Sequence, residues 1–294
     1  MKVSHFFLWL FLFSLYGCSG QIISEYFPYD ISNANKKYNL PKELHEISGL
    51  SYSSKKKLYC VQDEKGIVYS YDLKKNAIHK EIKFGKDNDF EGVALVGKKL
   101  YALKSNGTLY KIQHFNHPEK MKITKITTFL DEKYDSEGLC FDEENNQLLV
   151  ACKRTPNKDK NLKYIYRFDL ETQQLIKKPF LKIKVDDVYD MKNASSTQKK
   201  YDKVMGKIGA NNTVFNPSGI AIHPFTSDVY IVSAEGNTLV VVNREGKLKY
   251  VVDLKKSLFK QPEGITFDSK GTMYISNEGH GEKATIKSFK YISN

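Results

Sequence analysis

A two-residue pattern recurs five times along the chain: a serine or a glutamate followed by glycine, directly before a strand-like run. The closest copies are DFEGVALVGKKLYALKSNG (89–107), DSEGLCFDEENNQLLVACK (135–153) and QPEGITFDSKGTMYISNEG (261–279). Looser copies occur at 46–64 and 216–236. The residues before the glycine are separated by 43, 46, 81 and 45 residues, and they are Ser48, Glu91, Glu137, Ser218 and Glu263. A period of about 45 residues is typical of propeller blades.

Each period holds four strand-like runs, which in the first repeat are ISGLSYS, KLYCVQ, GIVYSYDL and AIHKEIKF. The second run is almost wholly apolar, as in a strand buried on both faces. The third alternates, with Ile67, Tyr69 and Tyr71 on one side, which predicts a half-exposed strand. The fifth repeat has only three runs, and KKYNL near the N-terminus matches the missing one. Pairing there would close the ring and leave no open sheet edge.

We therefore predict an all-β fold, a five-bladed β-propeller closed by an N-terminal strand. The propeller domain is expected over 36–294, with an insertion at about 187–215. The insertion lacks strand alternation and indicates a loop with room for a helical turn. Because the interval of 81 residues could hold two blades, a six-bladed propeller remains the alternative.

The N-terminus, MKVSHFFLWLFLFSLYGC, has one lysine, an apolar run and then a cysteine, which is typical of a secretory signal. Its ending LYGC resembles a bacterial lipobox. We expect 1–17 to be a signal peptide, Cys18 to be lipidated with palmitate-type chains, and 18–35 to be a tether. The two residues directly after Cys18, Ser19 and Gly20, are not acidic, which by resemblance to lipoprotein sorting signals favours the outer membrane of the cell envelope. An uncleaved anchor or an ordinary signal is the alternative.

The formal net charge is +12, but only three cations are arginines, Arg154, Arg167 and Arg244. Bidentate recognition of phosphates and bases depends on arginine, and the lysines form no single stripe, so we exclude nucleic acid as a partner. The expected partners are the membrane, through the anchor, and a protein, an anionic glycan or a small molecule. The chain is expected to be a monomer. Three cysteines remain after cleavage, an odd number that favours small buried side chains over a disulfide framework.

The first strand of each blade lines the central channel of a propeller, so the residues before the glycines should meet at one mouth. Three carboxylates there, from Glu91, Glu137 and Glu263, would repel one another unless they bind protons or a cation. With the hydroxyls of Ser48 and Ser218 they suit Ca²⁺, which prefers oxygen ligands. No histidine or cysteine cluster points to zinc. The alternative is that each glutamate caps backbone amides of a neighbouring blade and binds nothing.

The second strand runs back to the same mouth, where it can add oxygen ligands. Asp63, Asn277 and Glu278 lie at such strand ends. Two long segments also leave from this face, the basic loop 153–163 and the insertion 187–215. The predicted site is therefore an acidic centre with a lysine-rich rim.

Together, EISGL, DFEGVAL, DSEGLCFD, PSGIAIHP and QPEGITFD resemble the SdiA-regulated family of bacterial propeller proteins. The resemblance covers about 38–293. It implies a five-bladed propeller related to NHL repeats, a calcium site and export, with no assigned biochemical role. We expect a calcium-binding scaffold module. The alternatives are a calcium-dependent hydrolase (a lactonase, esterase or phytase-like enzyme) and an interaction module without an ion. The sequence has no G-x-S-x-G motif, and no catalytic residue is assigned.

Overall fold

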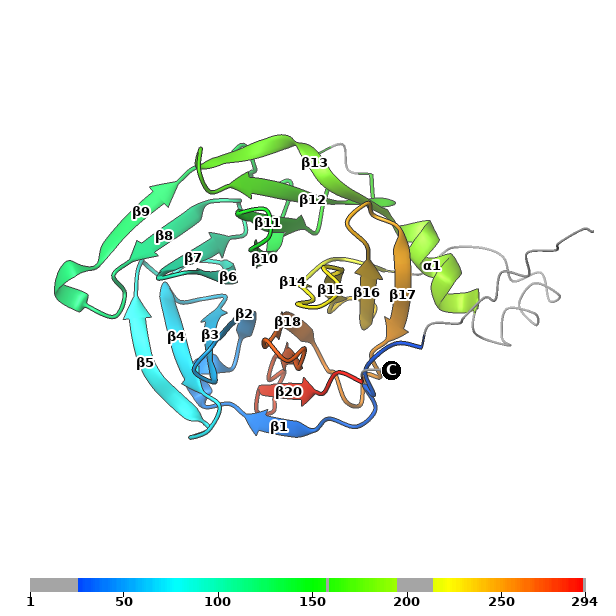
Figure 1. The fold of residues 1–294 in the computed structure, drawn as a ribbon, viewed down its shortest axis with the longest axis horizontal. Coiled ribbons are helices and arrows are strands. Elements are labelled where there is room, and N and C mark those ends of the chain that lie inside the picture. The colour runs from blue at the N-terminus through cyan, green and yellow to red at the C-terminus, as the bar shows by residue number, and fades with distance from the viewer. Residues whose placement is uncertain (1–25, 157–158, 195–213, 293–294) are drawn as a thin grey trace, which may run out of the picture.

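The computed structural model describes residues 26–156, 159–194 and 214–292, which form a ring of five four-stranded antiparallel sheets (Figure 1). Blade 1 is β2 (Ile47–Ser53), β3 (Lys57–Gln62), β4 (Ile67–Asp72) and β5 (Ala77–Lys83). Blade 2 is β6 (Phe90–Val96), β7 (Lys99–Lys104), β8 (Leu109–Gln113) and β9 (Lys122–Ile126). Blade 3 is β10 (Ser136–Asp142), β11 (Gln147–Cys152), β12 (Leu162–Asp169) and β13 (Gln174–Lys184).

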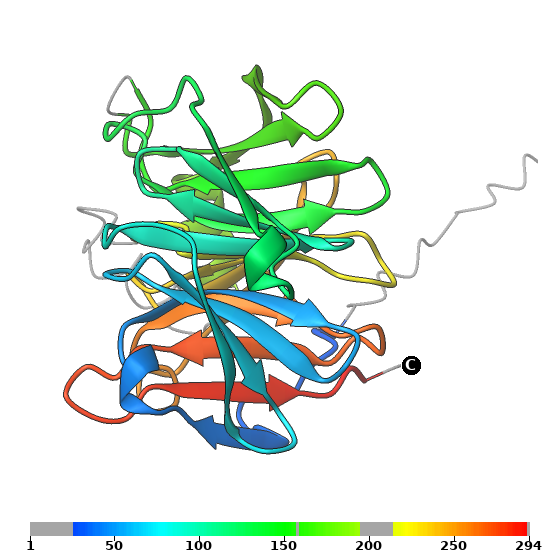
Figure 2. The same ribbon diagram turned by 90° about the vertical axis from the view of Figure 1, so that its left-hand side faces the viewer.

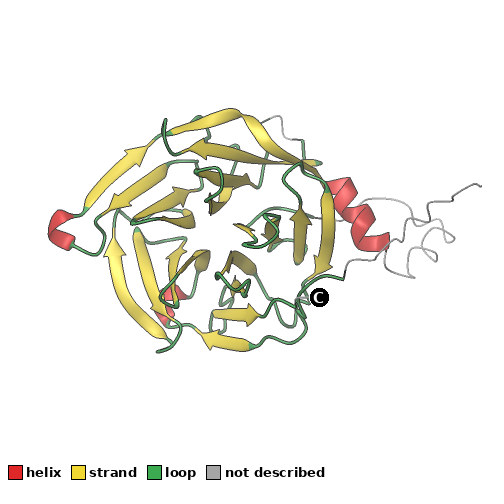
Figure 3. Cartoon of the chain, viewed as in Figure 1, coloured by secondary structure: helices red, strands yellow, loops and turns green. Residues whose placement is uncertain are grey.

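Blade 4 is β14 (Gly219–Ile222), β15 (Val229–Ser233), β16 (Thr238–Val242) and β17 (Leu248–Asp253). Blade 5 is β18 (Pro262–Phe267), β19 (Met273–Asn277), β20 (Thr285–Phe289) and β1 (Lys36–Asn39). Helices are few in the described chain, and they are η1 (Lys42–Leu44), η2 (Pro118–Lys120) and α1 (Val185–Ala194). Figure 3 shows two of them, η2 and α1, at the outer edge of the ring of strands.

Closure of the ring is as predicted, because the N-terminal strand β1 completes blade 5. It pairs antiparallel with β20, from Lys36 opposite Ser288 to Asn39 opposite Thr285. The five-bladed fold is confirmed, and the described chain between β13 and β14 forms α1 rather than a blade. The remainder of the predicted insertion, 195–213, lies outside the described residues.

The apolar core is divided into five clusters, one in each gap between neighbouring blades. Tyr69 and Tyr71 of β4 pack toward blade 5, while Val68 packs toward blade 2. The prediction that this third strand is half exposed was wrong, because blades stacked face to face cover both of its sides. The alternating exposure appears one strand further out, in β5.

The glycine of each repeat sits where two blades come closest. A Cβ added to Gly264 would lie 2.4 Å from the carbonyl oxygen of Ser48, and one on Gly219 would lie 2.3 Å from that of Glu263. Gly49 likewise faces the Cα of Gly92 at 2.7 Å. Any side chain here would collide with backbone of the next blade. The glycines are therefore required for close approach, in keeping with their role elsewhere in sheets.

The proposed signal peptide and Cys18 lie outside the described residues. No helix in the part of the chain that the structure describes is long and apolar enough to cross a membrane. Cys60, Cys140 and Cys152 are free thiols. Cys140 is opposite Leu149 and Cys152 is opposite Ser136, so the two do not face each other across their hairpin.

Candidate cation-binding site

The glutamate before each glycine is placed by a β-bulge. In β6, Phe90 pairs with Lys104 and Gly92 with Leu103, so Glu91 has no partner residue in β7. Glu137 is skipped in the same way between Ser136 and Gly138. Bulges redirect side chains and are frequent beside functional sites. In the repeated Glu-Gly pair, the bulge therefore changes the direction of the glutamate side chain. The glycine lets the backbone of the next blade approach closely.

The three bulge glutamates come from different blades and influence one another, as predicted. Burial and the neighbouring carboxylates of Glu137, Asp89 and Glu263 raise the pKa of Glu91 far above its usual range. Burial and Glu137 raise the pKa of Glu263 to about 8. Burial raises the pKa of Glu137 to about 7, against the effect of Lys153, whose Nζ lies 3.2 Å from Oε1 of Glu137. Among the described residues, Lys153 is the only cation that forms an ion pair with one of these three carboxyls.

A second tier of polar residues surrounds the bulge residues and was missed by the sequence prediction. Each member lies two residues before the serine or glutamate of its repeat and is an acid or an amide: Glu46, Asp89, Asp135, Asn216 and Gln261. Backbone bonds tie this tier to the ends of the second strands. Asp63 N donates to Glu46 O at 3.3 Å, and Glu278 N donates to Gln261 O at 3.0 Å. The acid or amide at this position in all five repeats was the signal that could have identified it.

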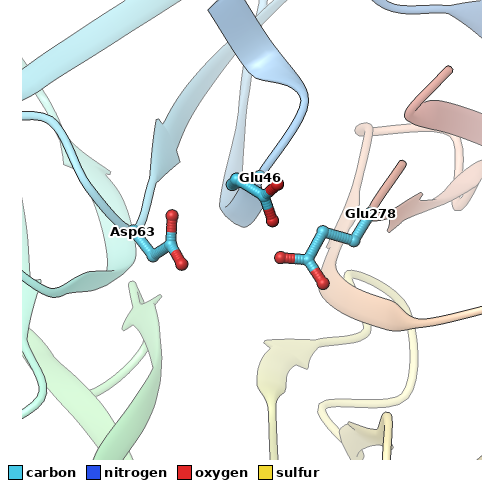
Figure 4. Close-up of side chains that lie close together, drawn as sticks. All are labelled: Glu46, Asp63 and Glu278. Carbon is cyan, nitrogen blue, oxygen red and sulfur yellow. The ribbon is translucent and has the colours of Figure 1, made fainter. Parts of the chain in front are cut away.

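Glu46, Asp63 and Glu278 form the tightest acidic group among the described residues that could hold a metal. Their nearest carboxylate oxygens all lie within 4.8 Å of one another, and Figure 4 shows the three side chains pointing toward one another. Glu46 and Asp63 belong to blade 1 and Glu278 to blade 5, so the triad spans the junction where the ring closes. Asp63 and Glu278 were predicted site residues, and Glu46 was not.

The electrostatics of this triad are unfavourable without a cation. Burial raises the pKa of Glu278 to about 9, and a shared hydrogen bond with Glu46 adds to it. Burial, with Glu46 nearby, raises the pKa of Asp63 to about 6. His45 contacts Glu46 at 2.7 Å, but no lysine or arginine of the described chain lies within 4.0 Å of the three carboxylates.

Two side chains of the site carry buried polar atoms without a hydrogen-bond partner: Asp63, at Oδ1, and Asn277, at both Oδ1 and Nδ2. Asn277 is only 3% exposed. A buried unpartnered polar group costs on the order of 1–3 kcal/mol. Such groups beside three carboxylates fit a site for an oxygen-liganded cation, so the residues present suit Ca²⁺.

The two predicted serines have other contacts, and only Ser48 lies at a bulge, whereas Ser218 directly precedes β14, which pairs with β15 in regular register. Ser218 Oγ donates to Pro262 O of blade 5 at 2.8 Å and accepts from Ala234 N at 3.2 Å. Ser48 is buried, and its carbonyl accepts a hydrogen bond from Ser276 Oγ at 3.1 Å. Ser218 therefore joins blades 4 and 5, which is the capping role considered as the alternative for the glutamates.

A cavity of about 850 Å³ opens beside the mouth at blades 3 and 4, where the basic rim was predicted. Its lining includes Lys153, Lys163, Phe215, Asn216 and Glu235. Lys163 is 5% exposed, and its Nζ donates to Lys153 O at 2.8 Å and to Asn216 Oδ1 at 2.6 Å. Burial lowers the pKa of this amine. The cavity thus places a buried amine next to the acidic centre, in a lining that also includes the acids Glu132, Asp159, Asp186 and Glu235.

A family model described as SdiA-regulated matches residues 31–280. No curated protein matches the chain. Among solved structures, Myxococcus xanthus glutaminyl cyclase superposes with a TM-score of 0.58 at 11% identity, over 89% of this chain and 97% of that one. Kuenenia stuttgartiensis hydrazine synthase gives a TM-score of 0.51 at 13% identity, over 84% of each chain. At such identity the likeness supports the propeller fold alone.

Proposed function

Because the chain belongs to the SdiA-regulated family, we propose that it is an exported, lipid-anchored propeller that binds Ca²⁺ and serves as a binding module. Lipidation at Cys18 would hold it in the cell envelope, at the outer membrane. A monomer is proposed, with an anionic small molecule, a glycan or a protein as its ligand. The single observation that supports calcium binding most strongly is the triad of Glu46, Asp63 and Glu278 within 4.8 Å.

Calcium suits this triad better than other common cations. The donors are carboxylate oxygens, and Ca²⁺ accepts six to eight oxygen ligands with flexible geometry. Asn277 is a candidate neutral oxygen, since its amide is buried without a partner. Among the bulge glutamates, Glu263 is close enough to interact electrostatically with both Asp63 and Glu278.

The position of Lys153 supports the junction of blades 5 and 1 as the place of the proposed ion. Lys153 N bonds to Asp135 O as Asp63 N bonds to Glu46 O, so the two residues occupy equivalent places in blades 3 and 1. The ammonium of Lys153 neutralises Glu137 and lies 3.8 Å from Glu235. Blade 3 thus carries its own cation, whereas blade 1 has an aspartate at the corresponding place.

A calcium-dependent hydrolase is the second candidate, favoured by the cavity beside the mouth. Bound Ca²⁺ would supply polarisation of a carbonyl or phosphoryl oxygen. Lys163 and Lys153 would attract the anionic part of a substrate into the cavity, and Phe215 would contact an apolar part. No described residue is singled out as the general base, so the binding module is the preferred function.

The test is calcium titration of the full-length protein in detergent, with melting temperature and calorimetric heat as readouts and Mg²⁺ as the competing ion. A ligand that binds only the native state stabilises it by about 2.7 kcal/mol at a hundredfold excess over its Kd. We expect a Ca²⁺-specific shift that is lost in the double variant Asp63→Asn, Glu278→Gln.

Asp87→Asn is the matched control, because Asp87 is an exposed carboxylate that already pairs with Lys65 at 2.8 Å. It should leave the shift unchanged. Absence of any shift, with no calcium by elemental analysis of the freshly purified protein, would exclude both calcium-dependent functions. A shift together with turnover of lactone, ester or phosphate substrates that stops in Lys163→Met would favour the hydrolase.

A further inference from the structure

Exposed apolar side chains gather on the face opposite the acidic mouth. Tyr26 is 85% exposed, Phe225 is 56% exposed and Ile292 is 52% exposed. Phe225 lies in the turn from β14 to β15, at the strand ends away from the bulges. In Figure 2 the C-terminal end of the chain lies on the right, and η1, next to the mouth, lies on the left.

These side chains form one patch, because the segments that carry them are bonded together. Ile292 N donates to Pro28 O at 3.0 Å, and the rings of Phe225 and Tyr291 lie 5.5 Å apart. Tyr29 is buried beneath them and donates its hydroxyl to Gly271 O at 2.7 Å. We call Tyr26, Phe225 and Ile292 the apolar patch. The chain therefore enters the propeller at a fixed point within this patch.

Exposed lysines surround the patch and continue across the same face. They lie in the turns of blades 5, 1 and 2 and near the C-terminal end: Lys270, Lys290, Lys55, Lys56, Lys74, Lys75, Lys98 and Lys99. Asp72 and Asp268 in these turns accept hydrogen bonds from turn amides. Asp30 and Glu144 are acidic groups beside the patch. In the turns of blades 5, 1 and 2 the lysines outnumber these acids, so this part of the face is basic. The turns of blades 3 and 4 on the same face carry Glu143, Glu144, Glu171 and Glu245.

The tether is short. Only eight peptide steps separate Cys18 from Tyr26, which span at most about 28 Å when fully extended. A lipid on Cys18 would therefore keep the patch closer to the bilayer than any other part of the propeller. Basic residues and amphipathic aromatic rings are the side chains that favour an anionic membrane surface.

We propose that the propeller lies on an anionic bilayer with the apolar patch and its lysines against the headgroups, which directs the acidic mouth away from the membrane. The proposal rests on the lipid anchor at Cys18 of the proposed function. The acidic mouth would be repelled by the same headgroups, so both ends of the molecule favour one orientation. The ligand of the mouth would then approach from the aqueous side.

The test uses a single tryptophan as a depth probe in the full-length chain. The only native tryptophan is Trp9, in the expected signal peptide, so the background is Trp9→Phe. Phe225→Trp places the probe in the patch. Ile123→Trp is the matched control, since Ile123 is also an exposed apolar residue, on the outermost strand of blade 2. Each protein is mixed with vesicles of brominated phosphatidylglycerol or brominated phosphatidylcholine.

We expect phosphatidylglycerol vesicles to quench and blue-shift the Phe225→Trp emission and to leave the Ile123→Trp emission nearly unchanged. Equal quenching of the two probes in vesicle-bound protein would overturn the orientation. Flotation with the vesicles reports on the anchor separately. A protein that floats without selective quenching retains the anchor and loses the orientation. A Cys18→Ser protein that floats as fully as the native chain and keeps the selective quenching would remove the anchor and leave the membrane-facing patch standing.

The lysines are tested by the partition of an unlipidated Cys18→Ser protein onto phosphatidylglycerol vesicles. A lysine near such a surface contributes about fivefold to the partition coefficient. Lys270→Gln with Lys290→Gln should therefore lower partition by about 25-fold. The control pair Lys42→Gln, Lys86→Gln makes the same charge change at exposed positions on the side of the mouth, in η1 and between β5 and β6, and should have a much smaller effect. Equal effects of the two pairs would indicate attraction by net charge and overturn the proposal.

Discussion

Lys153 Nζ lies 3.2 Å from Oε1 of Glu137, a carboxylate that is 8% exposed in its side chain. This pair is the only lysine–glutamate contact of the described chain that involves a bulge glutamate. It neutralises blade 3 and leaves the opposite side of the mouth, with Asp63 and Glu278, without a fixed cation. The residue directly after the second strand differs from blade to blade, and in blades 1 to 5 it is Asp63, Ser105, Lys153, Ala234 and Glu278. The charge around the mouth is therefore asymmetric, with the cation in blade 3 and the acids in blades 1 and 5.

Replacing Lys153 with methionine should leave the buried carboxylate of Glu137 without its paired cation. The pKa of Glu137, about 7 with the lysine present, should rise further. Breaking a buried pair by removing one partner costs about 3–5 kcal/mol, and about half of that is expected here because Lys153 is partly exposed. Urea unfolding at pH 8 measures the loss. Lys65→Met, which breaks an exposed pair with Asp87, should cost less than about 1 kcal/mol.

Gly264→Ala should separate two blades. The added Cβ would lie 2.4 Å from Ser48 O and 2.7 Å from Ser276 Oγ, neither of which can move away easily. Overpacking of this kind costs about 1–3 kcal/mol, which thermal or urea unfolding would detect. Gly85→Ala is the control, because its Cβ would meet only a side-chain atom of Phe90 at 3.7 Å. Equal stability of the two variants would contradict the close-approach role of the repeat glycines.

The metal-free protein should lose stability as pH rises from 6.5 to 8. Glu137 and Glu263 have folded pKa values of about 7 and 8, above their ordinary value of 4.5, so the folded state holds more protons than the unfolded state in this window. Stability present at lower pH is therefore lost as the pH rises through this window, by roughly 2 kcal/mol for the two groups together. Urea unfolding in a chelator measures this.

Two further results would identify the carboxylates as the cause. Glu137→Gln with Glu263→Gln should flatten the decline and stabilise the metal-free protein at pH 8, by removing repulsion. Calcium should stabilise the wild type more at pH 8 than at pH 6.5, because it competes with protons for the same oxygens. A metal-free stability that is flat from pH 6.5 to 8 would argue against shared protons at the mouth.

His223 should make the protein sensitive to acid. Its Nδ1 accepts from the amides of Phe225 and Thr226 at 3.3 Å, so the proton is on Nε2, which faces Tyr29 Oη at 2.9 Å. Burial lowers the pKa of His223 to about 4. Of the charged groups nearby, Asp228 raises this pKa and Lys249 lowers it. The unfolded state binds the proton first, so stability is lost as pH falls from 6.5 toward 4.

Circular dichroism melts between pH 4 and 7 would show this loss. His223→Phe should cost about 1–3 kcal/mol at pH 7, because turn amides and Tyr29 lose their partner, yet it should be less sensitive to acid. His79→Phe, at an exposed strand position, should keep the wild-type profile. An unchanged acid response in His223→Phe would assign the sensitivity to another group.

The sequence predicted much of the architecture because propeller blades are local. Each blade is a meander of consecutive strands, so the spacing of Ser48, Glu91, Glu137, Ser218 and Glu263 predicted five blades. The interval of 81 residues left six as the alternative, and the five sheets of the structure decided between them. The closure by Lys36–Asn39 followed from one missing strand. The third strand was misjudged because its alternation is typical of an exposed face, and only the stacking of blades buries both sides of Tyr69 and Val68.

The sequence by itself determined that carboxylates would meet at one mouth, and it identified Asp63, Glu278 and the bulge glutamates. The tertiary structure decided which of them lie together. Glu46 and Glu278 are more than two hundred residues apart, and they meet because blade 5 closes against blade 1. The distances between side chains from different blades depend on the curvature of the ring and on the bulges. A periodic sequence pattern specifies the repeat, but it contains no information on the curvature of the ring or on the direction in which a bulge turns a side chain.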